Sequence, residues 1–446
     1  MNKTFFLSKY VNFVKFENKY ILFHSLFGNP LLITKKEYTD ILSKKTSDAL
    51  SKELINNCFY IKSDNIEENI LNNIYKKKIT ELKKGTYFDC LTINLTSRCN
   101  FSCTHCLPIK EKEIHNTANS IDTLTTEKIK QRIDDFFNFS KSKKRKQFFF
   151  GGREPLIKKR LLKETINYIN KKALEYNVNI QYIMFTNASL IDNKIAQFLK
   201  ANNFLIFSSI EGPENINNLQ RIFPNKSGTY EKITNGWKIL KEEKIPLIAA
   251  SITLTPSNYK KAINKDFLIE LKNFDIKRLA INVDHTAHWN RQQTNKLIKN
   301  IISYDNLTRE IDIKLTGQWK DVFTNLFSTP SNSLRTSFCE SHSGFCLNIT
   351  SDNLLSFCPA NNEKLHITSS INELVESEEY LSTIQSRWIH NIKECNGCPI
   401  EGFCSGGCTV TNTVIKNSKR FKERCYFLKS LFEYQLKKYV NELNEE

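Results

Sequence analysis

Short apolar runs alternate with segments whose apolar residues recur every three to four positions, from about residue 88 onward. The runs have the length of buried strands, and the segments between them have the period of amphipathic helices. Strands are predicted at 91–95, 147–150, 180–185, 205–210, 247–254 and 278–283, with helices such as 126–139, 163–176, 194–201 and 230–243 between them. Six alternations favour parallel pairing through right-handed crossovers. We therefore expect an α/β fold built on a partial, TIM-like (β/α)6 barrel, with its chemistry at the C-terminal ends of the strands.

The two ends of the chain show different patterns. Residues 1–85 predict a small α/β module, with strands at 10–16 and 20–24, a turn at 28–30, a helix opened by Thr34 and Glu37, and a second helix at 65–84 that Gly85 ends. After about residue 326, cysteines and glycines dominate as far as Cys425, and a last amphipathic helix follows at 426–443. We expect three domains: the N-terminal module (1–85), the barrel (86–325) and a cysteine-rich cluster domain with a C-terminal helix (326–446).

The composition limits the class of protein. The chain has 446 residues, and none of its apolar runs approaches the roughly 18 residues of a membrane span. Its first residues contain too much Lys and Asn for a signal peptide, so we expect a cytoplasmic protein without a membrane partner. The net charge of +18 would suit an acidic peptide or nucleic acid. However, Lys, Asn and Ile are frequent along the whole chain, as AT-rich coding would produce, so nucleic acid is not the favoured partner.

Eleven of the 13 cysteines are clustered, which in a long cytosolic chain favours metal ligation or catalysis over disulfides. The first group, Cys99, Cys103 and Cys106, follows the first predicted strand. A [4Fe–4S] cluster takes four thiolates, so three leave one iron open to bind a substrate or cofactor. The alternative is a zinc site that His105 or His115 completes.

This loop resembles the CxxxCxxC signature of the radical SAM superfamily, and the resemblance covers roughly residues 88–320. It implies that Cys99, Cys103 and Cys106 hold the cluster that cleaves S-adenosylmethionine to a 5′-deoxyadenosyl radical. No separate acid or base is assigned. His105 stands where the family usually has an aromatic residue beside the adenine.

The ends of the next three predicted strands also resemble segments of this family. Residues 150–155 resemble its GGEP segment, which receives the amino group of the cofactor, although Arg153 stands where glycine is usual. Residues 186–189 resemble the TNG turn, and residues 209–213 resemble the S-x-D-G-P segment, with Glu for Asp. Arg221 follows where a partner of the cofactor carboxylate is common. The resemblance thus implies a cofactor site formed by His105, Gly151, Gly152, Glu154, Asn187, Ser209, Glu211 and Arg221.

The remaining clustered cysteines lie in the last third of the chain: Cys339, Cys346, Cys358, Cys395, Cys398, Cys404, Cys408 and Cys425. Their spacing alone would also fit structural zinc ribbons. Four glycines lie among them, at 397, 402, 406 and 407, and their bare backbone lets amide N–H groups point at cluster sulfurs.

This segment resembles the SPASM domain of radical SAM peptide modifiers. By that resemblance, one auxiliary [4Fe–4S] cluster is held by Cys339, Cys346, Cys358 and Cys408, and the other by Cys395, Cys398, Cys404 and Cys425. Asn353 stands where the family usually has glycine, and asparagine tolerates the left-handed conformation. Cys58 and Cys90 lie outside the groups, and we expect both to be buried structural thiols.

Together the resemblances imply a radical SAM oxidoreductase that modifies a ribosomally made precursor peptide, with S-adenosylmethionine and three [4Fe–4S] clusters as cofactors. The N-terminal module would recognise the leader segment of the precursor by adding it as a strand. An electron donor such as flavodoxin or ferredoxin is expected. Two auxiliary clusters offer an electron exit, and no cysteine near the barrel mouth is left to return a hydrogen, so we expect an oxidative cross-link, either C–C or thioether.

Two alternatives lie within the family and one lies outside it. A peptide epimerase would return a hydrogen to the substrate. An enzyme like the anaerobic sulfatase maturases would form formylglycine, but those enzymes have Asp where Pro359 follows Cys358 and lack a long N-terminal module. A zinc-ribbon protein that binds nucleic acid would explain the cysteine pairs and the charge, but neither the strand–helix alternation nor the loop motifs.

Overall fold

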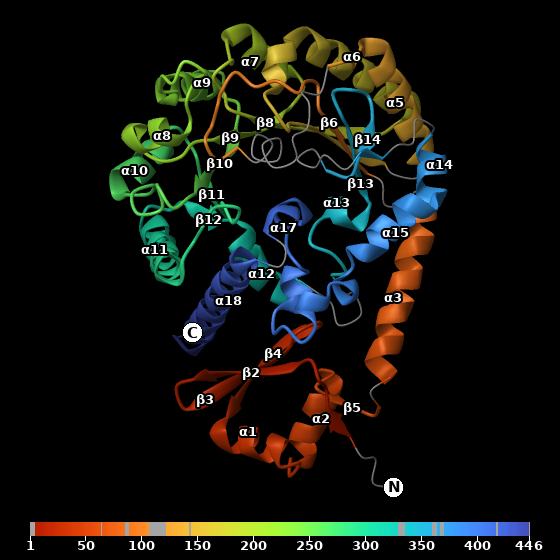
Figure 1. Ribbon diagram of the computed structural model, residues 1–446, viewed down its shortest axis with the longest axis vertical. Helices are drawn as coiled ribbons and strands as arrows, with labels where there is room; N and C mark the ends of the chain where they lie inside the picture. Colours follow the sequence, from red (N-terminus) through yellow and green to blue (C-terminus); the bar gives the residue numbers. More distant parts are fainter. Residues whose placement is uncertain are drawn as a thin grey trace.

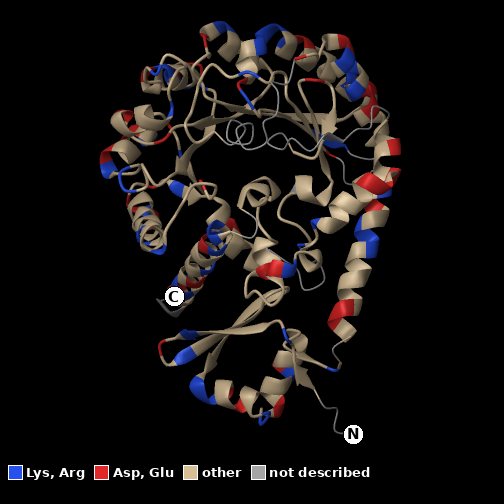
Figure 2. Ribbon diagram, viewed as in Figure 1, with Lys and Arg blue, Asp and Glu red and all other residues tan. Residues whose placement is uncertain are grey.

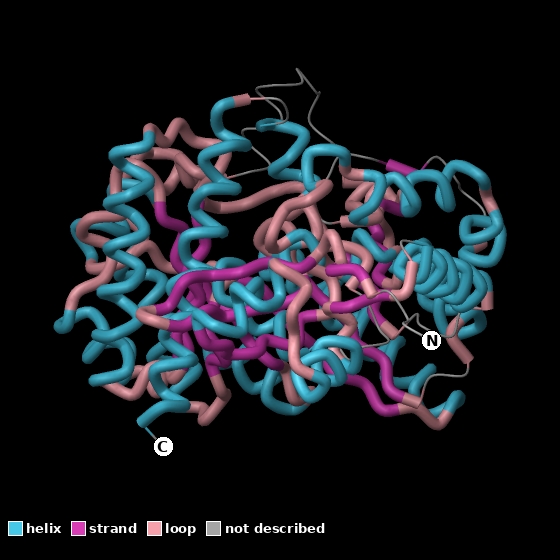
Figure 3. The backbone as a smooth tube through the Cα atoms, turned by 90° about the horizontal axis from the view of Figure 1, so that it is seen from below, coloured by secondary structure: helices cyan, strands magenta, loops and turns pink. Residues whose placement is uncertain are grey.

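A ten-stranded sheet forms the centre of the computed structural model, which describes residues 5–63, 65–84, 89–106, 122–141, 144–328, 335–358, 364–365, 370–415 and 418–445. The strand order is β12-β11-β10-β9-β8-β7-β6-β13-β14-β15. Neighbours from β12 to β13 are parallel, and β14 and β15 join antiparallel. Figure 1 shows helices along the outer arc of this sheet, and the strands lie at the centre of the view from below in Figure 3.

All six predicted barrel strands are present. They are β6 (Cys90–Ile93), β7 (Arg145–Phe150), β8 (Asn179–Thr186), β9 (Leu205–Ser209), β10 (Leu247–Leu254) and β11 (Arg278–Val283). They neighbour one another in sequence order, which confirms the α/β fold with a partial (β/α)6 barrel. The unpredicted strand β12 (Lys314–Thr316) extends the sheet beyond β11, and it is too short to show a periodicity.

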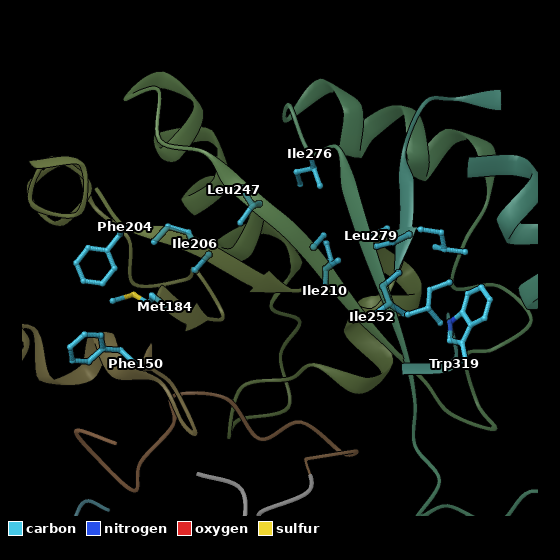
Figure 4. Packing of buried hydrophobic residues seen from close by; sticks show 14 of the residues in the cluster. Phe150, Met184, Phe204, Ile206, Ile210, Leu247, Ile252, Ile276, Leu279 and Trp319 are labelled. Carbon is cyan, nitrogen blue, oxygen red and sulfur yellow. The ribbon is translucent and has the colours of Figure 1, made fainter. Parts of the chain in front are cut away.

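Helices cover the outer face of the sheet: α5 (Thr126–Phe139), η1 (Pro155–Lys158), α6 (Lys159–Tyr176), α7 (Asn193–Ala201), α8 (Glu214–Gln220), α9 (Tyr230–Glu242), α10 (Lys265–Asn273) and α11 (Arg291–Glu310). Several begin at a polar cap, since Thr125, Asp192 and Asn264 each accept a backbone N–H from the first turn. Figure 4 shows the apolar core of the barrel, in which Phe150 and Ile252 are fully buried.

Charged side chains of both signs cover these outer helices. In the view of Figure 2, Lys and Arg are interspersed with Asp and Glu instead of gathering at one place. Some pair one helical turn apart, such as Lys171 with Glu175. None of the helices in the described ranges combines the length and apolar character needed to cross a membrane.

The N-terminal module contains a three-stranded antiparallel sheet in the order β2-β3-β4. Its elements are β1 (Phe6–Leu7), β2 (Val11–Phe16), β3 (Lys19–His24), β4 (Gly28–Thr34), α1 (Lys35–Leu42), α2 (Asp48–Asn56), β5 (Tyr60–Ile61) and α3 (Asn65–Lys83). The two predicted strands, the capping box of Thr34 and Glu37, and the helix at 65–84 are confirmed. Helix α2 was not predicted, and Gly85 lies outside the described residues.

The predicted turn at 28–30 is wrong. These residues begin β4, and the chain turns at residues 25–27 instead. Gly28 has a φ of +78°, and a Cβ there would lie 2.2 Å from the carbonyl oxygen of Leu326. The glycine therefore allows a close contact between the module and helix α12 (Gln318–Ser328), which the sequence pattern could not reveal.

The cysteine-rich segment continues the barrel sheet, because β13 (Cys346–Ile349) pairs in parallel with β6. Helix α12 crosses the boundary predicted near residue 326. The other elements are α13 (Glu340–Ser343), β14 (Leu355–Ser356), β15 (Lys364–Leu365), α14 (Ile371–Glu376), α15 (Glu378–Ser386), η2 (Ile389–Asn391), η3 (Lys393–Cys395), α16 (Glu401–Cys404), α17 (Thr409–Ile415) and α18 (Lys419–Glu445). The last helix begins at Lys419 instead of residue 426, so Cys425 lies inside it.

Candidate active site

Three thiols and the ends of several strands surround one cavity of about 380 Å3. Cys99, Cys103 and Cys106 line it from the loop that follows β6. The N–H groups of Ser102 and Thr104 tie this loop to the segment around the end of α8 through hydrogen bonds of 2.7 and 2.9 Å. Small-molecule sites usually measure about 300–1,000 Å3. The cavity thus has the size of a cofactor site at the predicted end of the barrel.

Each of the three thiols has a hydrogen-bond donor from a different loop. Asn187 Nδ2 lies 3.9 Å from Cys99 Sγ, Arg221 Nη1 lies 3.6 Å from Cys103 Sγ, and Arg153 Nη1 lies 3.8 Å from Cys106 Sγ. Arg153, the departure from the family pattern, therefore adds a cation beside a thiol. Two cations and an amide therefore lie within hydrogen-bond reach of the sulfurs that would bind iron.

Burial disfavours the thiolate of Cys103, because it raises the pKa of this thiol to about 12 in spite of the nearby Arg221. The thiol therefore keeps its proton until a metal displaces it. Three converging sulfurs with these donors fit a [4Fe–4S] cluster bound through three thiolates.

A buried carboxylate holds two of the side chains that line the cavity. Glu211 Oε1 lies 3.1 Å from His105 Nε2 and 2.9 Å from Arg221 Nη2, and Oε2 accepts the Thr253 N–H at 2.7 Å. Burial alone would raise the pKa of Glu211, but the charges of His105 and Arg221 outweigh it and lower the pKa. Glu211 does not itself line the cavity, so it positions other residues.

His105 offers a polar atom to a ligand in the cavity. Its Nδ1 is buried and has no hydrogen-bond partner among the described residues. Because Nε2 contacts Glu211, Nδ1 is the ring nitrogen that is left for a ligand. A ligand atom that can form a hydrogen bond there would satisfy it.

Glu154 lines the cavity but is already hydrogen-bonded to the protein. Its carboxylate accepts Leu156 N–H at 3.1 Å, Thr186 Oγ1–H at 2.8 Å and Asn187 N–H at 2.8 Å, so it ties the end of β8 to η1. Burial raises the pKa of Glu154 to about 7 against these hydrogen bonds. Its binding of a cofactor amino group stays a prediction.

The two glycines after β7 have different surroundings. Gly152 lines the cavity with a φ of +83°, which other residues adopt only with strain, and a Cβ there would displace the Asn94 side chain, whose Oδ1 lies 2.5 Å away. Gly151 is not among the residues that line the cavity, and a Cβ there would lie 3.3 Å from Phe185 Cβ. Ser209, at the end of β9, lines the cavity as the sequence predicted.

Further lining residues were missed by the sequence analysis: Phe185, Thr253, Val283, Asp284, His285, Thr286 and Thr411. Asp284 and His285 follow the sixth predicted strand directly, so the rule that found the other strand ends could have found them. Burial, aided by Arg424, lowers the pKa of His285 to about 3, which keeps the imidazole neutral. Thr411 comes from α17, and nothing in the sequence indicated that this helix reaches the barrel mouth.

The C-terminal cysteines fall into two groups in space. Cys395, Cys398, Cys404 and Cys425 lie close enough for their charges to interact, and so do Cys339, Cys346 and Cys408. For seven of the eight cysteines, this is the division that the SPASM resemblance implies. For Cys358, which follows β14, the grouping stays a prediction.

The residues between these cysteines have distinct roles. Gly397, Gly406 and Gly407 have φ values of +75°, +76° and +72°, which glycine adopts without strain. At Gly402, a Cβ would lie 2.5 Å from the carbonyl oxygen of Ser25, so this glycine allows the N-terminal module to approach. Asn353 has a φ of +67°, which confirms the left-handed turn.

The two cysteines outside the groups are half-buried instead of fully buried. Cys58 lies in the N-terminal module, where burial raises its pKa. Cys90 begins β6, and its Sγ lies 2.8 Å from Cys346 Sγ. The sequence did not reveal this contact because it did not predict that β13 pairs with β6.

Comparisons with known proteins agree with this geometry. Residues 93–267 match the Radical SAM superfamily. The radical SAM cyclopropyl synthase TigE of Paramaledivibacter caminithermalis is 23% identical over 433 residues, which cover 90% of this chain and 89% of that protein. A cysteine-type anaerobic sulfatase-maturating enzyme of Clostridium novyi is 30% identical over 174 residues, or 38% of this chain and 44% of that protein.

The fold is also similar to solved structures. The structure of native anSMEcpe with bound AdoMet and the Cp18Cys peptide has a TM-score of 0.62 and 20% sequence identity, and it covers 80% of this chain and 99% of that chain. Native anSMEcpe with bound AdoMet gives a TM-score of 0.61 at 19% identity, with the same coverage. The residues that match the superfamily contain the first cysteine group and the ends of β7, β8, β9 and β10, whereas the end of β11 lies outside them. Residues 93–267 of this chain thus match the Radical SAM superfamily in sequence, and the likeness to these solved structures is one of fold.

Proposed function

We propose that this protein is a radical SAM maturase that forms an oxidative cross-link in a ribosomally made peptide. The observation that carries the proposal is the convergence of Cys99, Cys103 and Cys106 on one cavity, each with its own hydrogen-bond donor, in a chain with two further cysteine groups. Bound by these three thiols, a [4Fe–4S] cluster with S-adenosylmethionine would supply a 5′-deoxyadenosyl radical able to abstract hydrogen from an unactivated carbon.

The residues of this chain prepare the cavity for that chemistry. Glu211 fixes His105 and Arg221, and Arg221 in turn reaches Cys103. Glu154 holds the end of β8, which carries Asn187. The lining side chains are thereby oriented before any ligand binds, which reduces the cost of ordering them.

A peptide substrate is supported by two comparisons. TigE, similar over nine-tenths of this chain, is named for making a cyclopropyl group, and the similar fold of anSMEcpe is solved with a peptide. An oxidative outcome is supported by the cavity lining. Of the described residues, the thiols that line the cavity are Cys99, Cys103 and Cys106, all assigned to the cluster. The two C-terminal groups would accept the electron that the substrate radical loses.

The product mass tests this proposal. The protein, reconstituted without oxygen, is incubated with S-adenosylmethionine and with short peptides encoded beside its gene, in deuterated water. We expect a peptide that is lighter by about two daltons, with no deuterium at an α-carbon and with a new bond mapped by fragmentation. An unchanged backbone with one α-deuterium would mean epimerisation. A product that a hydrazide reagent captures as an aldehyde would mean formylglycine.

The N-terminal module is the proposed site of the peptide leader, because one edge of its sheet is open. Among the described residues, β2 pairs with β3 alone. Ser25 N–H donates to Tyr10 O at 2.8 Å, so alternation along an antiparallel strand turns the backbone groups of Phe13 and Lys15 toward the open edge. A leader strand would pair with these groups.

A proline tests this edge without disturbing the rest of the module. Lys15 is exposed, and Lys15→Pro removes one outward N–H. We expect it to weaken binding of a fluorescent precursor peptide at least tenfold, whereas Lys15→Ala, which keeps the N–H, binds within about twofold. Equal affinities for the two variants would rule out strand addition at this edge.

A further inference from the structure

Cys90 and Cys346 lie side by side on neighbouring strands, β6 and β13, and are in register. Their Sγ atoms are 2.8 Å apart, closer than two sulfur atoms in van der Waals contact. Neighbouring strands lie about 4.8 Å apart, and a disulfide needs Cα atoms about 4.4–6.8 Å apart. The backbone of this pair is thus already placed for a disulfide.

We propose that Cys90 and Cys346 form a reversible dithiol that closes to a disulfide when the surrounding cysteine group holds no cluster. Cys346 belongs to the group of Cys339 and Cys408, so a disulfide takes one sulfur out of that group. The consequence for cluster loading rests on the proposed function, whereas the disulfide itself does not. A cluster bound by this cysteine group and the Cys90–Cys346 disulfide exclude each other, since both need the Cys346 sulfur.

The chemistry needs an oxidant, for which hydrogen peroxide suffices. The Cys90 thiol reacts with peroxide to give a sulfenic acid and one water. The Cys346 thiol then attacks that sulfur, forms the S–S bond and releases a second water. The two thiols lose two electrons and two protons, and peroxide is reduced to water. A dithiol reductant reverses the step by exchange.

The identity of the cysteine that becomes linked to Cys346 distinguishes a specific disulfide from random oxidation of a cysteine-rich segment. Cys339 lies close enough to Cys346 for their charges to interact, so it is a rival partner, and Cys408 belongs to the same group. Cys90 has the sulfur contact of 2.8 Å and the strand register, and it is half-buried, so a small oxidant reaches it. The structure thus predicts one specific linkage, between peptides that contain Cys90 and Cys346.

The test uses the full chain after its iron has been removed by a chelator without oxygen. The apo-protein is treated with a small excess of hydrogen peroxide, alkylated and digested without reduction for mass spectrometry. We expect a linked pair of peptides that contain Cys90 and Cys346, with a mass two hydrogens below the summed masses of the two reduced peptides. Alkylation of Cys346 should fall at least tenfold. Dithiothreitol should restore the alkylation. In Cys90→Ser, Cys346 should remain alkylated, and the matched control Cys58→Ser, outside all groups, should behave as wild type.

Linkage of Cys346 to Cys339 or Cys408, or equal alkylation of Cys346 in wild type and Cys90→Ser, would overturn the proposal. A second readout is iron uptake. Oxidised wild type should reload one cluster fewer than reduced wild type, whereas oxidised Cys90→Ser should match its reduced form. If reduced wild type takes up no iron at any site, the proposed function has failed, and the peptide map still decides whether the disulfide forms.

Discussion

Replacing Glu211 by Gln tests the buried charge pair that positions the cavity lining. The side chain of Glu211 is 0% exposed and that of Arg221 is 12% exposed, at a distance of 2.9 Å. Removing one charge leaves Arg221 charged in a site that water scarcely reaches, and such losses cost about 3–5 kcal/mol. Gln keeps an acceptor for Arg221, so we expect about 3 kcal/mol of lost stability, at the lower end of this range.

A surface pair of the same chemistry provides the control. Glu423 lies 2.9 Å from Arg291, whose side chain is 54% exposed. Water and salt screen such a pair, so Glu423→Gln should cost about 0–1 kcal/mol. Urea unfolding of the apo-proteins at pH 7 compares the two variants with wild type. Equal losses would refute the reasoning, because burial is the main difference between the two pairs.

The pH dependence of the stability tests the direction of the pKa shift of Glu211. The folded protein lowers the pKa of Glu211, so its carboxylate adds stability above the unfolded pKa of about 4.3 and loses it as the pH falls through the folded value. The difference between wild type and Glu211→Gln should therefore be full at pH 7 and shrink below about pH 4. A difference that grows as the pH falls would contradict the direction of the shift.

Two further changes test other parts of the site. Cys395→Ala or Cys425→Ala should lower the iron content by about four atoms and reduce product formation, while S-adenosylmethionine cleavage persists; full iron with full product would show that these are not ligands. Gly152→Ala should weaken S-adenosylmethionine binding at least tenfold in equilibrium binding while the iron content stays unchanged, because a Cβ there meets Asn94; unaltered binding would show that this loop moves freely.

The sequence predicted the barrel well because its strands and helices carry strong local periods. The same reasoning placed Cys99, Gly152 and Asn187 at strand ends, and all three line one cavity. Parallel strands fix that outcome, since their C-terminal ends share one edge of the sheet. The capping box at Thr34 was equally local, and it was confirmed.

What the sequence could not predict depends on contacts between distant segments. The sequence indicated a turn at Gly28, but glycine is required there because the backbone of Leu326 leaves no room for a side chain. In the sequence, Cys90 belongs to no cysteine group. In the structure, the pairing of β13 with β6 brings Cys346 beside it. The motif indicated Glu211 as a cofactor contact, which stays a prediction, but it did not indicate that the buried carboxylate would hold His105 and Arg221. Local patterns carry no information about such pairings.

The central claim is that Cys99, Cys103 and Cys106 generate a radical from S-adenosylmethionine. Its most direct test is 5′-deoxyadenosine formation by the anaerobically reconstituted protein with dithionite, followed by chromatography. Wild type and the control Cys58→Ala should form 5′-deoxyadenosine, whereas the triple replacement of Cys99, Cys103 and Cys106 by Ala should form none and lose about four irons. Undiminished 5′-deoxyadenosine formation by the triple variant would contradict the account.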